Sequence, residues 1–233
     1  MATGQGDLGL RVGRVAAPLR EQVLEVVRQA ILDFRYKPGQ RLIERELIEQ
    51  TGVSRTTIRE VLRELEAEGL VTTIPQKGAI VVVPTPEEAA ELYEVRSALE
   101  QLTVRNFVAR ASDKQVTALR RKADDFNQVV ERGEDTRAML RAKDAFYDVL
   151  FEGAGNKQVS AILGSLQARV RMLRAASMSD PDRGVKIVAE LDALVSAIEA
   201  RDADAAAEAC AIHLGQAETS GVKGISSYSP SDE

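Results

Sequence analysis

Residues 53–71 read VSRTTIREVLRELEAEGLV, and this stretch decides the fold of the N-terminal part of the chain. At about 100° per residue, Ile58, Val61, Leu62 and Leu65 fall together on one side of a helix. The arginines at positions 55, 59 and 63 fall with residue 56 on a stripe roughly 130° away. The apolar side predicts packing against a core. The cationic side is either a solvated face or a face that meets a polyanion, and the neighbouring segments decide between the two.

The neighbouring segments predict two more helices before this one and a β-hairpin after it. Helices are expected over residues 18–35 and 44–50, separated by a Lys-Pro-Gly-Gln turn, and Ser54 is the expected N-cap of the third helix. The runs VTTIPQ and AIVVVP around Gly78 predict two strands. This order is typical of a winged helix-turn-helix, in which the second helix of the pair enters the major groove of DNA. We therefore expect the arginine stripe to face DNA.

The rest of the chain reads as helices only. Six are predicted between Pro86 and Val222, at 86–110, 113–132, 135–153, 157–178, 183–201 and 203–219. Their short connections predict an antiparallel bundle. The expected fold is therefore mainly α, with a winged helix-turn-helix at 13–85 that carries a two-stranded hairpin, and an all-α six-helix bundle at 86–222. Residues 1–12 and 223–233 are polar and are expected to be disordered.

Charge differs between the two predicted domains. Residues 11–85 hold 12 Lys and Arg against 10 Asp and Glu, whereas residues 86–233 hold 19 against 25. A slightly cationic N-terminal part joined to an acidic C-terminal part suits a DNA-binding module on a domain that does not bind DNA.

Composition argues against other classes of protein. The chain has no apolar run of membrane-spanning length and no signal-peptide pattern at its start, and its single cysteine, Cys210, suits the reducing cytoplasm. It contains no Gly-x-Ser-x-Gly motif, no phosphate-cradling glycine loop and no pair of histidines, so an enzyme is not expected. Cys210 and His213 share a helix face, but no third residue is in place to orient them.

The N-terminal segment PGQRLIERELIEQTGVSRTTIREVLRELEAEGLVTTIPQKGAIVVVP resembles the winged helix of GntR-family bacterial transcription regulators. YEVRSALEQLTV, FYDVLFEGAGN and ALVSAIEARDADAAAEACAIHL resemble the ligand-binding domain of the FadR-like branch of that family. Six helices rather than seven favour its VanR-like subgroup. The resemblance implies DNA contacts from Arg45, Arg55 and Arg59, from Thr56, and from Gly78 at the wing tip. The residues expected to bind DNA are Arg45, Ser54, Arg55, Thr56, Thr57, Arg59, Lys77 and Gly78. The alternative for the arginines is ordinary surface ion pairing.

Many proteins of this branch hold a divalent metal with one Asp and three His, and this chain departs from that pattern. The corresponding positions are Lys143, Tyr147, Leu191 and His213, of which His213 alone keeps a family ligand. Asp144 is one residue out of register. One ligand of four cannot build such a site, so no metal and no other cofactor is expected.

Lys143 falls near the centre of an apolar helix face and must leave the core, lose its proton or meet a negative partner. We expect Lys143 to supply the positive charge that a metal supplies in the resembling proteins and, with Tyr147, to hold an acidic or polar ligand. Pairing with a carboxylate such as Glu100, or reaching the surface, is the alternative. Arg96 faces either this cavity or Glu100, and the pair is favoured. Leu191 is expected to line the cavity and His213 to sit in it as a satisfied side chain.

The expected function is sequence-specific transcription regulation, as a repressor, in response to a small acidic or partly apolar metabolite. A homodimer would place two winged helices on a pseudo-palindromic operator. The alternative is an effector-independent DNA-binding regulator whose degenerate cavity no longer takes a ligand.

Overall fold

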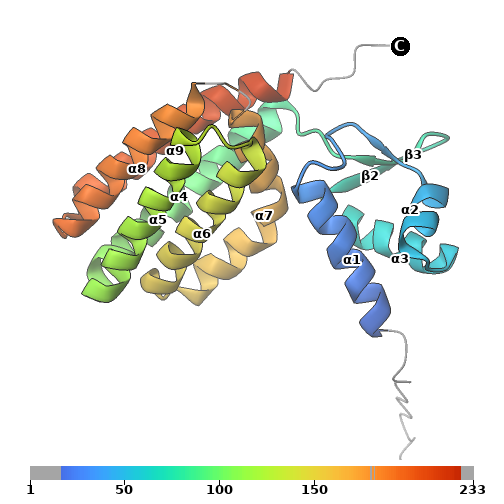
Figure 1. Cartoon of the computed structure of the whole chain (residues 1–233), viewed down its shortest axis with the longest axis horizontal. Coiled ribbons are helices and arrows are strands. Elements are labelled where there is room, and N and C mark those ends of the chain that lie inside the picture. The colour runs from blue at the N-terminus through green and yellow to red at the C-terminus, as the bar shows by residue number, and fades with distance from the viewer. Residues whose placement is uncertain (1–16, 179, 181, 227–233) are drawn as a thin grey trace, which may run out of the picture.

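The computed structural model describes residues 17–178, 180 and 182–226, and it divides into two parts along the chain (Figure 1). The N-terminal part contains α1 (Ala17–Leu32), β1 (Arg41–Leu42), α2 (Glu44–Thr51), α3 (Arg55–Ala67), β2 (Val71–Ile74) and β3 (Gly78–Val81). The C-terminal part contains α4 (Pro86–Arg110), α5 (Asp113–Glu131), α6 (Thr136–Ala154), α7 (Lys157–Ser177), α8 (Arg183–Glu199) and α9 (Ala203–Ser226). The predicted combination of a winged helix-turn-helix and a six-helix bundle is confirmed.

The helix α3 forms as its sequence predicts. The Ser54 hydroxyl accepts a hydrogen bond from the backbone N–H of Thr57 at 3.2 Å, which caps the helix. Ile58, Val61 and Leu65 on its apolar face are fully buried, in one core with the apolar face of α1. The arginine stripe is consequently left on the outer side of α3.

The sheet has three strands rather than the two that the sequence predicted. Arg41 and Leu42 form β1, which pairs antiparallel with β3, so the strand order is β1-β3-β2. Leu42 is buried in the winged-helix core while Arg41 is exposed, which is the alternation of a strand reduced to two residues. Two residues are too few for a periodicity to be recognised in the sequence, and only pairing with β3 defines the strand.

The bundle is built of long helices lying side by side, with α4 running along α9 (Figure 1). Capping boxes at Thr85 and Ser112 begin α4 and α5, as suits their sequences. The helix α9 continues to Ser226, so residues 223–226 are helical and not part of a disordered tail. The predicted N-terminal arm at 1–12 and residues 227–233 lie outside the described residues. In the described ranges, no helix combines the length and apolar composition needed to cross a bilayer.

The two parts contact each other through α7 and the end of α1. Met172 of α7 is buried in the core of the winged helix, and Phe34, just after α1, packs against the core of the bundle. Arg171 donates to the backbone oxygen of Leu32, and Arg137 donates to that of Asp33. These contacts hold the winged helix against one side of the bundle.

Candidate functional site

A cationic groove lies on the outer side of α3. It has a volume of about 640 Å³ and is lined by β1, the start of α2, α3 and the two strands β2 and β3 that flank the wing. Its lining includes five arginines and the wing glycine: Arg41, Arg45, Arg55, Arg59, Arg63 and Gly78. We refer to it as the arginine groove. The side chains of Arg45, Arg55 and Arg59 are 78%, 66% and 56% exposed, so they are free to reach a large partner.

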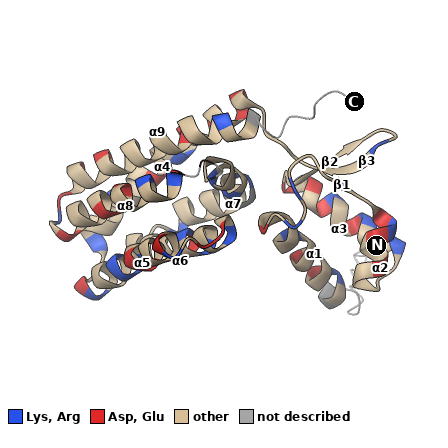
Figure 2. Cartoon of the chain, turned by 45° about the horizontal axis from the view of Figure 1, so that its top comes forward, with Lys and Arg blue, Asp and Glu red and all other residues tan. Residues whose placement is uncertain are grey.

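Acidic and basic residues lie close together along α2 and α3, as the colours of the ribbon show (Figure 2). Glu44 at the start of α2 lies 2.9 Å from Nε of Arg59 and 3.8 Å from Nε of Arg55, and Glu49 lies 3.7 Å from Nε of Arg45. The ion-pairing alternative is therefore present, with partners on α2 rather than on α3 itself. Exposed pairs of this kind contribute about 0–1 kcal/mol, so they do not prevent the arginines from engaging a polyanion.

Of the other predicted DNA-binding residues, Gly78 lines the groove, whereas Ser54, Thr56, Thr57 and Lys77 lie outside its lining. Thr56 is exposed at the start of α3, whereas Ser54 and Thr57 are partly engaged with each other, their hydroxyl oxygens 3.0 Å apart. Lys77 is exposed at the turn between β2 and β3. Gly78 has φ +83°, a left-handed conformation that suits glycine. A Cβ at this position would lie 3.7 Å from Nε of Arg41, so the glycine lies beside that guanidinium.

Arg41 and Arg63 were not among the predicted site residues, although both line the groove. Arg63 was visible in the sequence as a member of the arginine stripe. Arg41 was not recognised as a site residue, because its position depends on β1, and the pairing of β1 with β3 cannot be read from the sequence.

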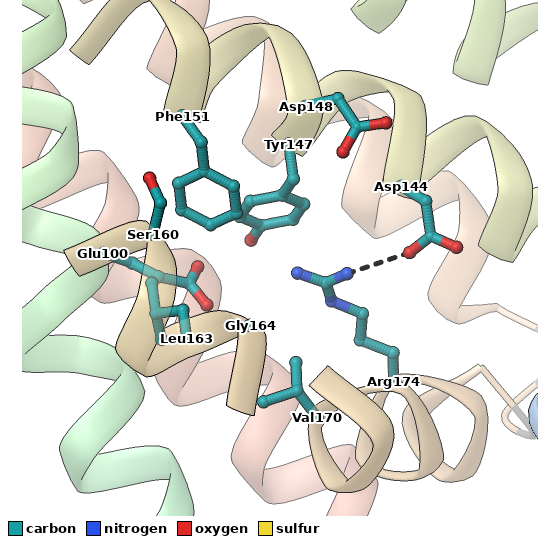
Figure 3. A pocket seen from close by; sticks show the side chains of 10 residues that line it. All are labelled: Glu100, Asp144, Tyr147, Asp148, Phe151, Ser160, Leu163, Gly164, Val170 and Arg174. Atoms are coloured by element: carbon teal, nitrogen blue, oxygen red, sulfur yellow. Dashed lines mark hydrogen bonds and ion pairs between the residues drawn. The ribbon is translucent and has the colours of Figure 1, made fainter. Parts of the chain in front are cut away.

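The second site is a pocket of about 300 Å³ in the bundle, between α4, α6 and α7 (Figure 3). Tyr147 and Phe151 of α6 form one wall and Leu163 of α7 another, with Glu100 of α4 at its inner end. The Arg174 guanidinium lies 4.0 Å from the centre of the Tyr147 ring and donates to Asp144 Oδ1 at 3.1 Å. The pocket is thus partly apolar and carries one cation and several carboxylates.

Two buried polar atoms of the pocket lining have no hydrogen-bond partner among the described residues, namely Oε2 of Glu100 and Nε of Arg174. Glu100 Oε1 accepts from Arg96 Nε at 3.0 Å, which is the predicted pair. Burial pushes the pKa of Glu100 upward, but Arg96 and Arg174 outweigh burial and keep the pKa below its usual range. Glu100 is therefore an ionised acceptor whose charged form the nearby Tyr147 hydroxyl also favours, and its Oε2 is not in hydrogen-bonding geometry with any described residue. Buried polar atoms are normally satisfied, so these two mark a place that a ligand or water completes.

Lys143 lies in a separate buried chain of polar groups. Its Nζ is 2.8 Å from Nε2 of His213, whose Nδ1 is 2.5 Å from Glu190, which in turn pairs with Arg183 at 2.5 Å. Burial, together with the nearby Arg174 and Arg96, lowers the pKa of Lys143 well below its usual value. Lys143 is 2% exposed, so it does not reach the surface, and among the described residues its Nζ contacts His213 while Glu100 is paired with Arg96. Of the alternatives the sequence left open, loss of the proton fits this environment.

The five predicted effector-binding residues do not share one cavity. Tyr147 lines the pocket, whereas Arg96, Lys143, Leu191 and His213 are buried outside its lining. Leu191 is packed in the bundle core. The sequence also missed Glu100 and Arg174 as pocket residues, because α4 and α7 approach α6 only in the folded bundle.

The residues present do not fit the metal that the resembling proteins hold. The one remaining imidazole has Nε2 bound to Lys143 and Nδ1 bound to Glu190. Within the described part of the chain, no three His, Cys, Asp or Glu side chains are grouped so that they could hold a metal ion.

Comparison with known proteins assigns each of the two parts of the chain to a known domain family. Residues 19–81 match the model of "Bacterial regulatory proteins, gntR family", and residues 91–216 match that of the FCD domain. The chain belongs to the GntR family of bacterial regulatory proteins. It is a DNA-binding transcription regulator, not an enzyme, and it carries the FCD type of effector-binding domain.

Similar proteins include several transcription regulators. This GntR-family chain is 34% identical to the Nta operon transcriptional regulator of Aminobacter aminovorans over 144 residues, 61% of this chain and 67% of that protein. It is 24% identical to the HTH-type transcriptional repressor RspR of Escherichia coli over 84% of this chain and 86% of RspR. A GntR-family crystal structure from Rhodococcus sp. RHA1 shares the fold, with a TM-score of 0.77 and 23% identity over 88% of this chain and 97% of that one.

Proposed function

We propose that this regulator binds operator DNA through the arginine groove and that a small metabolite in the α4–α6–α7 pocket controls the binding. The protein would act as a cytoplasmic homodimer on a pseudo-palindromic operator, so that two grooves meet two half-sites. It would act as a repressor, as the relative named RspR is described. The observation that carries the proposal is the pocket with its two unpartnered polar atoms, in a domain of the effector-binding type.

The groove supports DNA binding by its charge and its shape. Arg55 and Arg59 project from the first two turns of α3, where a recognition helix contacts base edges. Arginine can donate two hydrogen bonds to guanine, and exposed arginines beside the wing can bind phosphates. Glu44 orients Arg55 and Arg59 in the free protein and is exchanged for DNA on binding.

Charge reversal tests the groove. An operator is first selected from random duplex DNA with the unmodified protein, and binding is then measured at several salt concentrations. Arg55→Glu with Arg59→Glu should weaken binding by at least about a hundredfold and flatten the salt dependence. Arg121→Glu with Arg132→Glu, at two exposed arginines in and just after α5, changes the net charge equally and is the matched control, which should change binding by less than about twofold. Equal effects of the two changes would exclude the groove as the DNA-binding surface.

The pocket indicates the chemistry of the metabolite. Arg174 Nε needs an acceptor and Glu100 Oε2 needs a donor, while Phe151, Leu163 and Val170 offer apolar contact. A small molecule with an anionic or carbonyl group, a hydroxyl or amino group and a short apolar portion satisfies all of these. Hydroxy acids and amino acids are the simplest examples. This assignment keeps the acidic, partly apolar ligand that the sequence predicted, but holds it by Arg174 rather than by Lys143.

A thermal-shift screen of carboxylic, hydroxy and amino acids tests the pocket, because a ligand of the native state raises the unfolding temperature. Gly164 lines the pocket, and a Cβ at this position meets no other atom within 4 Å. Gly164→Leu should therefore fill the pocket and abolish the shift, whereas Gly164→Ala should preserve it. Binding that survives Gly164→Leu would refute this location. If no compound shifts the unmodified protein or alters its operator affinity, the effector-independent alternative replaces the proposal.

A further inference from the structure

We infer that Asp144 and Arg171 form a direct link between the effector pocket and the DNA-binding part, through which pocket occupancy alters how the winged helix is held. This inference rests on the proposed function for its biological meaning. The link itself consists of contacts between described residues, and it can be tested without ligand or DNA.

The pocket end of the link is the carboxylate of Asp144, which lines the pocket. Two arginines of α7 share it. Oδ1 accepts from Arg174 at 3.1 Å (Figure 3), and Oδ2 accepts from Arg171 at 2.6 Å. Arg174 also lines the pocket, and its Nε is the unpartnered donor described above. An acceptor group of a ligand that engages Nε therefore binds the same guanidinium that Asp144 binds through Nη1, and a shift of that guanidinium toward the ligand changes its contact with Asp144.

The DNA-binding end of the link is the turn that follows α1. Arg171 donates from Nε to the backbone oxygen of Leu32 at 3.1 Å and from Nη2 to the Asp33 carboxylate at 3.3 Å. The side chain is 9% exposed. The Arg171 guanidinium thus contacts both a pocket residue, Asp144, and the end of α1. Because the side chain is buried, little water can compete for these contacts.

The turn after α1 is held in a conformation that depends on such contacts. Phe34 has φ +56°, a left-handed conformation that is unfavourable for a bulky residue. Its side chain packs against the bundle core. The backbone N–H groups of residues 33–36 all donate to carbonyls within the last turns of α1. Because α1 packs on the recognition helix α3, loosening this turn changes the position or mobility of the DNA-binding surface.

The pocket and the winged helix are then coupled through the contact between Asp144 and Arg171. When a ligand binds Nε of Arg174 and shifts its guanidinium, the contact between Arg174 and Asp144 changes, and the strength and geometry of the contacts that Arg171 makes with Asp144 and with the end of α1 change with it. Coupling of this kind is reciprocal, so DNA binding changes ligand affinity by the same factor. Arg137, which donates to the Asp33 backbone oxygen at 3.2 Å, adds to the same junction from α6.

Hydrogen–deuterium exchange of the intact protein, measured without DNA or ligand, tests the link. Asp144→Asn should speed exchange at residues 33–36 by about tenfold, although residue 144 does not touch them, because Arg171 loses a charge-assisted anchor. Arg171→Gln should have an effect of the same size. In the double variant the two effects should not add, since both break one link.

The matched control is Asp148→Asn, which changes a second carboxylate on the same helix and in the same pocket. It should leave exchange at residues 33–36 unchanged. If Arg171→Gln unfolds the protein, Arg171→Lys replaces it, since lysine keeps the charge but cannot reach all three acceptors.

Unchanged exchange at residues 33–36 in Asp144→Asn, equal effects of Asp144→Asn and Asp148→Asn, or additive effects in the double variant would each overturn the link. None of these results would affect the tests of the groove and the pocket. Conversely, a pocket that binds no ligand would leave this exchange result intact.

Discussion

Nζ of Lys143 lies 2.8 Å from Nε2 of His213, and both side chains are buried in the bundle. Nδ1 of the same imidazole lies 2.5 Å from Glu190, so a neutral ring that donates from Nδ1 can accept from the lysine amine at Nε2. A lysine and a histidine thus satisfy each other where the resembling proteins bring metal ligands together.

His213 should make the protein less stable in acid. Burial, with a further effect of Lys143, lowers the pKa of His213 from 6.5 to about 4. Between these values the unfolded histidine binds a proton and the folded one does not, so stability falls as the pH falls. The loss is at most about 1.4 kcal/mol per pH unit. Urea unfolding at pH 7 and pH 5 should therefore show a larger drop for the unmodified protein than for His213→Gln. Parallel drops would mean that the histidine titrates normally.

Lys143 should likewise make the free energy of unfolding depend on pH, but in the alkaline range. Its pKa is lowered by burial, so as the pH falls from 10.5 the unfolded lysine is protonated first and the folded state loses relative stability. In Lys143→Met this component is absent. The free energy of unfolding of the variant, relative to that of the unmodified protein, should therefore rise as the pH falls from 10 to 7. A constant difference across that range would show that Lys143 remains charged in the fold.

Glu44 should restrain DNA binding. Its carboxylate contacts Arg55 and Arg59 and would lie near DNA phosphates in a complex. Glu44→Gln should raise affinity for nonspecific duplex DNA by about three- to tenfold at low salt, with less gain for the operator. Fluorescence anisotropy measures both affinities. The control is Glu208→Gln, an exposed residue of α9 that changes the net charge equally. A similar gain in the control would assign the effect to net charge alone.

Gly153 should be required for the packing of α6 on α4. A Cβ at this position would lie 2.3 Å from the Phe107 ring, whose side chain is fully buried. Gly153→Ala should lower the free energy of unfolding by about 1–3 kcal/mol. Gly164→Ala, in open space on α7, should instead raise it by about 0.5–1 kcal/mol, since alanine favours helix. Urea unfolding compares the two. A stabilised Gly153→Ala would show that Phe107 moves aside freely.

Much of the fold was predictable because its signals are local. The apolar face of α3, the Ser54 cap and the glycine and proline breaks each depend on residues within a few positions of one another. The helices of the bundle begin and end within a few residues of their predicted bounds, except α9, whose end is richer in polar residues and still helical to Ser226. Local signals also identified the arginine stripe and, through the Arg96–Glu100 spacing of four, a buried pair.

Sequence reasoning was less successful where partners come from distant segments. Lys143 was placed correctly in the core, but its partner, His213, is 70 residues away. The pocket likewise combines Glu100, Tyr147 and Arg174 from three helices, and the strand β1 exists only through its pairing with β3. No periodicity within one segment contains this information.

The amino-acid sequence by itself determined which segments are helical, which face of each helix is apolar and that α3 presents arginines. Helix formation and amphipathicity depend on neighbours within one or two turns. The tertiary structure alone decided that Lys143 is paired to His213, that Asp144 is shared by Arg171 and Arg174, and that Arg171 reaches the end of α1. Those outcomes depend on how the helices pack, and packing sets which distant charges must satisfy one another away from water.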